Sequence, residues 1–143
     1  MGKALRAGTI GNVVRCGLVA DLPYRNLKVW QAAVEIAGEV VELAAERRWR
    51  SYLRDQACRA AWSVAANIAE GNGRSTPLDY ASYIDRARGS LYELDTWLLA
   101  AVRERVLRDE ERSALELRIK DLSVRLNNLA NALRARTHLP SRG

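Results

Sequence analysis

Apolar residues recur at steps of three and four positions through most of the chain, which is the period of one face of an α-helix. This pattern predicts four helices, over about residues 26–48, 51–70, 76–105 and 109–136. Long amphipathic helices joined by short loops predict an all-α, antiparallel up-down four-helix bundle. The expected core positions are Leu27, Trp30, Val34, Ala37, Val41, Ala44, Leu53, Ala57, Ala61, Val64, Ile68, Ala81, Ile84, Leu91, Leu94, Leu98, Ala101, Leu115, Ile119, Leu122, Leu126, Leu129 and Leu133.

The two ends of the chain lack this pattern. Residues 1–22 carry scattered glycines without a helical or alternating period, and we expect a flexible N-terminal arm there. The bundle domain is expected over residues 23–137, followed by a disordered tail over residues 138–143. One globular domain suits a chain of 143 residues.

Helix ends are marked by residues that suit capping positions. Asn26 and Asp109 precede apolar runs and are expected to cap the first and fourth helices. Thr76 followed by Pro77 predicts the start of the third helix. Gly71 is expected in the left-handed position that often follows a helix C-terminus, so a loop of about five residues should join the second and third helices.

A glycine and a serine, Gly89 and Ser90, interrupt the predicted third helix. Glycine within a helix costs about 1 kcal/mol relative to alanine, so something should offset that cost. Ala61, Ala65 and Ala69 give the second helix a low-profile face. We therefore expect the two helices to approach closely at Gly89 and Ser90.

The segments Asn67-Ile-Ala-Glu-Gly-Asn-Gly-Arg74 and Arg88-Gly-Ser-Leu-Tyr-Glu-Leu-Asp-Thr96 resemble the four helix bundle protein family, which includes the ribosomal-RNA intervening-sequence proteins. Leu27-Lys-Val-Trp-Gln31 resembles the opening helix of that family, so the likeness spans about residues 24 to 136. The resemblance implies a homopentameric barrel. The related Avd proteins, accessory proteins of diversity-generating retroelements, imply a reverse transcriptase and its template RNA as partners.

The signature of this resemblance contains four charged residues, for which the residue types predict ion pairs that brace the second loop against the third helix. Direct contact of these charges with a ligand is the alternative. The signature residues are Asn67, Glu70, Gly71, Gly73, Arg74, Arg88, Gly89, Ser90 and Glu93.

The positive charge of the chain suggests a partner that carries phosphate or carboxylate groups. The net charge is +6, and only Lys3, Lys28 and Lys120 among the basic residues are lysines. Arginine binds phosphate and carboxylate groups through two parallel hydrogen bonds, although a GC-rich genome produces the same bias.

Arginines gather in the first and third predicted loops, which an up-down bundle places at the same end. We therefore expect a basic pole that binds RNA or DNA, with Trp49 either stacking on bases or lying along a solvated helix end. The candidate nucleic-acid-binding residues are Arg47, Arg48, Trp49, Arg50, Arg103, Arg105 and Arg108.

Candidate catalytic chemistry is sparse. The sole histidine, His138, lies in the predicted tail, so a Ser-His, Cys-His or di-iron site lacks its base or ligand. Cys16 and Cys58 form no metal-binding or disulfide pattern. We expect no enzyme activity, no metal and no cofactor. The lack of a disulfide pattern favours the reducing cytoplasm, and the absence of a long apolar run predicts a protein that does not enter membranes.

Two functions fit these observations. The first is a nucleic-acid-binding accessory protein, and the second is a scaffold that binds a protein such as a reverse transcriptase, without a nucleic-acid role. The bundle has more aromatic residues than a lean core should bury, which predicts a homo-oligomer. Trp62 lies off the expected inward face and is the candidate intersubunit contact.

Overall fold

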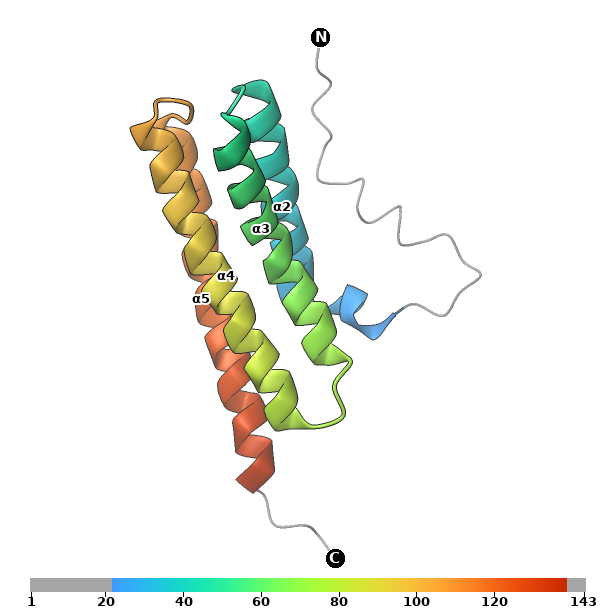
Figure 1. Ribbon diagram of the computed structural model, residues 1–143. Coiled ribbons are helices and arrows are strands. Elements are labelled where there is room, and N and C mark those ends of the chain that lie inside the picture. Colours follow the sequence, from blue (N-terminus) through green and yellow to red (C-terminus); the bar gives the residue numbers. More distant parts are fainter. Residues whose placement is uncertain (1–21, 139–143) are drawn as a thin grey trace, which may run out of the picture.

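The computed structural model describes residues 22–138, and over this range the chain is all-α, with no strand (Figure 1). The predicted arm and tail, apart from Leu22 and His138, lie outside the described residues. No helix in the described range is long and apolar enough to cross a membrane. The elements are η1 (Pro23–Asn26), α2 (Lys28–Glu46), α3 (Ser51–Asn72), α4 (Pro77–Arg103), α5 (Asp109–Ala135) and η2 (Arg136–His138).

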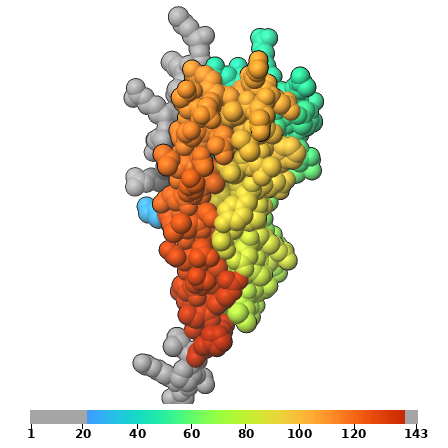
Figure 2. Space-filling view, turned by 90° about the vertical axis from the view of Figure 1, so that its left-hand side faces the viewer, coloured from blue at the N-terminus to red at the C-terminus, as the bar shows by residue number. Residues whose placement is uncertain are grey.

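The four long helices alternate in direction, as predicted. The α2–α3 and α4–α5 loops lie at one end of the bundle, and the α3–α4 loop lies at the opposite end (Figure 1). Each helix packs against its neighbours in sequence, and α2 also contacts α5. Figure 2 shows α4 and α5 side by side along their length.

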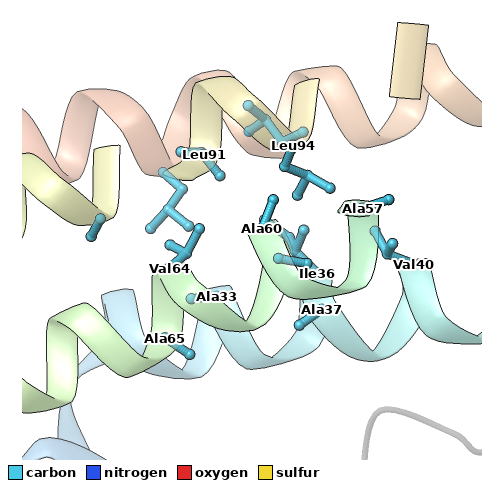
Figure 3. Packing of buried hydrophobic residues seen from close by; sticks show 14 of the residues in the cluster. Ala33, Ile36, Ala37, Val40, Ala57, Ala60, Val64, Ala65, Leu91 and Leu94 are labelled. Atoms are coloured by element: carbon cyan, nitrogen blue, oxygen red, sulfur yellow. The ribbon is translucent and has the colours of Figure 1, made fainter. Parts of the chain in front are cut away.

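The core combines alanines from α2 and α3 with leucines from α4 and α5. Figure 3 shows Ala60 and Val64 of α3 facing Leu91 and Leu94 of α4. Every predicted core position in α3 and α4 is buried. In α5 the prediction holds except at Leu129, which is only partly buried, while Ala130 is fully buried.

The predicted core face of α2 was partly wrong. Val41 is 40% exposed, whereas its neighbour Val40 is fully buried. Two apolar stripes overlap in this helix, and both satisfy the three- and four-residue spacing. The stripe that faces the core is Ala33, Ile36, Ala37, Val40 and Ala44.

Two predicted helix caps were wrong, and one is confirmed. Asn26 lies in η1, and α2 begins after Leu27, without a side-chain cap. Asp109 is the first residue of α5, and the cap position before it belongs to Arg108. The Thr76 hydroxyl accepts a hydrogen bond from the Asp79 backbone N–H at 3.2 Å, as expected of a cap.

The roles expected of two signature glycines were also wrong. Gly71 lies inside α3 and is buried, and no described glycine has a positive φ. A Cβ atom at Gly71 would lie 2.8 Å from Cδ2 of Tyr80 and Cβ of Tyr83, so this glycine permits the close approach of α4. At Gly89 a Cβ atom would meet nothing within 4 Å. The two helices do meet at Ser90, whose hydroxyl lies 2.8 Å from that of Ser63, but the glycine that close packing requires is Gly71 and not Gly89.

Candidate nucleic-acid interface

The C-terminus of α2 closes with two backbone hydrogen bonds. The Trp49 N–H donates to the Ala44 carbonyl at 3.1 Å, and the Arg48 N–H donates to the Ala45 carbonyl at 3.3 Å. This pattern is a Schellman motif. Arg48 occupies the position of that motif with a left-handed backbone, where glycine is the usual residue. Arg48 has φ 51°.

The C-terminus of α4 repeats the same geometry. The Val106 N–H donates to the Ala101 carbonyl at 3.0 Å, and the Arg105 N–H donates to the Val102 carbonyl at 3.0 Å. Arg105 has φ 63°. Arg48 and Arg105 therefore occupy equivalent positions on two neighbouring loops, and they are the only non-glycine residues with positive φ in the described part of the chain.

The two loops are joined by Trp49. Its side chain is 4% exposed, and its Nε1 donates a hydrogen bond to the Val106 carbonyl at 3.2 Å. We call the end of the bundle formed by residues 46–50 and 103–109 the loop pole. The expectation that Trp49 stacks on bases was wrong, because this side chain is part of the core and fixes the two loops together.

Three of the predicted arginines are held by carboxylates. Arg47 and Arg108 both form ion pairs with Glu111, at the start of α5. Arg50 lies 3.9 Å from Glu104. The structure thus brings all six arginines to one end, but only Arg48, Arg103 and Arg105 are without an ion pair among residues 22–138.

The loop pole itself holds six arginines against three carboxylates, and further acidic residues next to it reduce this excess. A larger region around the loop pole, residues 33–67 and 91–120, holds eleven Lys and Arg against twelve Asp and Glu. Residues 22–32, 68–90 and 121–138 hold eight against four. Acidic residues in α2 and in the first turn of α5 balance the arginines of the loops.

An open hollow of about 480 Å³ lies beside the α4–α5 loop. Its lining combines three arginines with apolar side chains, so it can accept a phosphate group at its edge. The residues around it are Arg47, Val102, Arg105, Val106, Leu107, Arg108 and Asp109.

With this geometry established, comparisons with known proteins define the family. Residues 25–128 match the family described as 23S rRNA-intervening sequence protein. The chain belongs to this family. A search of curated proteins found no match.

A solved structure supports the fold of this intervening-sequence protein. It is a protein with unknown function from the S23 ribosomal protein family of Bacteroides thetaiotaomicron, with a TM-score of 0.65 and 20% sequence identity. The likeness covers 71% of this chain and 97% of that one. At this identity the comparison establishes the fold alone.

The signature charges of this intervening-sequence protein form two separate groups. Arg74 pairs with Glu70 at 2.9 Å, lies 4.0 Å from Asp79 and donates a hydrogen bond to the Tyr83 hydroxyl. These contacts brace the α3–α4 loop against α4, as predicted for Arg74.

The other two charges act elsewhere. Arg88 lies 3.8 Å from Asp85, and Glu93 accepts a hydrogen bond from Trp97 Nε1 at 3.3 Å. They contribute nothing to the bracing of the loop, so that part of the expectation was wrong.

The uncharged signature residues have local structural roles. Asn67 Nδ2 donates to the Ser63 carbonyl at 2.8 Å, and the Ser63 and Ser90 hydroxyls are 2.8 Å apart, linking α3 to α4. Gly73 ends α3 with φ −81°, a conformation open to any residue. Trp62, the predicted intersubunit contact, is 46% exposed.

Glu111 gives the loop pole a pH dependence. The hydrogen bond from the Arg108 guanidinium is the largest cause that lowers the pKa of Glu111 from 4.5 to about 2, and the Arg108 backbone N–H and Arg47 add to it. Because the folded-state pKa is depressed, the stabilisation is fully present above about pH 4.5 and is lost as the pH falls toward 2. We expect Glu111→Gln to lower the free energy of unfolding at pH 7 more than near pH 2.5.

Chemical denaturation at both pH values measures this difference. Glu110→Gln is the matched control, because Glu110 lies in the same first turn of α5 and is exposed. Equal pH-dependent losses for the two variants would contradict a specific role for Glu111.

Proposed function

We propose that this intervening-sequence protein is a non-enzymatic protein that binds the phosphate backbone of RNA or DNA, with Arg48 and Arg105 as paired contacts. The observation that carries the proposal is the left-handed conformation of both arginines. A non-glycine residue in that conformation costs about 1–2 kcal/mol. The backbone hydrogen bonds of the two Schellman motifs offset part of this cost, and strained backbone positions of this kind concentrate at functional sites. Both side chains are exposed and form no ion pair within the described residues.

The surroundings of the two arginines suit phosphate binding. Trp49 holds the loops in a fixed relation, so the two guanidinium groups project from a rigid platform. Arginine offers parallel N–H donors that match phosphate oxygens. Contacts of this kind position a nucleic acid without reading its sequence. Because neighbouring carboxylates reduce the positive charge of the loop pole, we expect modest affinity from the loop pole alone.

The scaffold is the second candidate function. Trp62 on α3 and Leu117 and Val124 on α5 are large apolar side chains exposed to solvent. Each of these side chains is a separate candidate contact for another protein, either a second copy of the chain or a reverse transcriptase. A pure scaffold predicts negligible RNA binding at physiological salt, so a salt titration of RNA binding separates the two candidates.

The double variant Arg48→Gly/Arg105→Gly tests the nucleic-acid function with two readouts of opposite sign. Glycine adopts the left-handed conformation without a steric penalty, so we expect each substitution to raise the free energy of unfolding by about 0.5–1 kcal/mol. The same variant should bind RNA more weakly. Its slope of log affinity against log salt should flatten by about 0.7 for each lost contact with single-stranded RNA. Denaturation and fluorescence anisotropy with a labelled oligouridine measure the two effects.

Arg54→Gln/Arg59→Gln is the control for charge alone. Both arginines are exposed on α3 and lie outside the loop pole. A glycine variant that is more stable but binds RNA with unchanged affinity would show that the loop pole is not the contact surface. A glycine variant that gains no stability would refute the strain argument.

A further inference from the structure

The part of the described bundle that lies away from the loop pole also has an excess of positive charge. We call this the signature end, formed by residues 22–32, 68–90 and 121–138, where eight Lys and Arg face four Asp and Glu. Figure 1 shows the α3–α4 loop and the end of α5 in the lower part of the bundle, and η1 above them, beside the lower part of α3. The short helix η1 contacts α2 and α3, while η2 contacts α4 and α5. The basic residues therefore lie on all four helices of this part of the bundle or next to them, although they come from distant parts of the sequence.

All four carboxylates of the signature end form ion pairs with arginines of the same end. Glu70 and Asp79 contact Arg74, Asp121 contacts Arg125, and Asp85 contacts both Arg88 and Arg134. Four basic residues form no ion pair within the described chain. They are Arg25, Lys28, Arg86 and Arg136.

Arg86 is oriented by an aromatic side chain. Its guanidinium carbon lies 4.7 Å from the centroid of the Tyr83 ring, and that of Arg74 lies 4.5 Å from the same centroid. A cation over an aromatic ring is attracted to the ring without losing its charge. Arg86 is exposed, so its guanidinium stays open to a phosphate or to the face of a base.

From these observations we infer that the signature end is a second contact surface for single-stranded RNA and that it supplies more of the electrostatic affinity than the loop pole. This inference rests on the proposed function, because it assumes a nucleic-acid partner. Unneutralised charges distributed around one end suit a flexible phosphate chain that can wrap it. The guanidinium over Tyr83 adds a surface on which a base can stack.

Two triple variants with the same change in charge test the inference. Lys28→Gln/Arg86→Gln/Arg136→Gln removes three unpaired charges from the signature end, and Arg48→Gln/Arg103→Gln/Arg105→Gln removes three from the loop pole. We expect the signature-end variant to lose affinity for a labelled oligouridine by about tenfold to a hundredfold at physiological salt and its salt slope to flatten by about 2. The loop-pole variant should lose several-fold less. Circular dichroism and thermal melting verify that both variants remain folded.

The possible outcomes separate this inference from the proposed function. Equal losses, or a larger loss for the loop-pole variant, would overturn the inference while leaving RNA binding in place. Absence of salt-dependent RNA binding by the unmodified chain would overturn both. Competition by polyglutamate as effective as competition by unlabelled RNA would also overturn the inference, because the surface would then fit an acidic protein equally well.

Discussion

Replacing Trp49 with alanine is expected to lower the free energy of unfolding by about 3–5 kcal/mol, which is the range for truncating a large buried aromatic side chain. Trp49 is 4% exposed and belongs to the main core. Its indole N–H also reaches the Val106 carbonyl, in the loop between α4 and α5. Truncation would leave a cavity and would release the link between the two loops. Chemical denaturation of the purified protein measures the loss.

Two further substitutions determine the cause of that loss. Trp49→Phe keeps an aromatic ring but removes the donor to Val106, so it should cost at least the roughly 1 kcal/mol of one hydrogen bond, and clearly less than alanine. Trp62→Ala removes an exposed indole, and we expect a change within about 0.5 kcal/mol in the folded monomer. A cost below about 1 kcal/mol for Trp49→Ala would contradict its place in the core.

The sequence was sufficient to predict the architecture because local pattern and global fold agree in most of the chain. The leucines of α4 form a single apolar stripe, so the 3.6-residue period identifies the buried face of this helix. The buried face of α2 was harder to predict, because valine and alanine occupy adjacent positions around much of the circumference of this helix. Contacts with α3 and α5 decide which of its two stripes is buried, and the period alone does not.

The sequence predicted where the candidate site lies, but not which residues pair with its arginines. Up-down topology was enough to place the two arginine-rich loops at one end. The partner of Arg47 was missed because Glu111 lies 64 residues further along the chain, and only the packing of the bundle brings the two together. The burial of Trp49 was missed for the same reason, since the carbonyl that accepts its hydrogen bond lies in the other loop.

The charge of the signature end was missed because it is dispersed. Arg25, Lys28, Arg86 and Arg136 lie in separate segments, and none belongs to a visible run of basic residues. The dense cluster around Trp49 is easy to see in the sequence, yet carboxylates pair with two of its three arginines in the structure. A count of charge along each half of the predicted bundle would have found the difference without coordinates.

The second large effect is expected at Gly71. A Cβ atom there would lie 2.8 Å from both Tyr80 Cδ2 and Tyr83 Cβ and 3.2 Å from the Tyr80 carbonyl oxygen. The Tyr83 Cβ and the Tyr80 carbonyl cannot swing aside like the end of a long side chain, so α4 itself must move. Overpacking of this kind costs about 1–3 kcal/mol. We expect Gly71→Ala to lower the free energy of unfolding by about that amount, despite the better helix propensity of alanine.

Gly89→Ala is the matched control, because it makes the same chemical change inside a neighbouring helix. A Cβ atom at Gly89 meets nothing within 4 Å, so alanine should raise the free energy of unfolding by about 0.5–1 kcal/mol through reduced backbone entropy of the unfolded chain. Denaturation curves of the two variants should therefore shift in opposite directions. If both variants were stabilised, α4 would not pack tightly against α3 at Gly71. If Gly89→Ala alone were destabilising, the close approach would lie at Gly89, as the sequence first suggested.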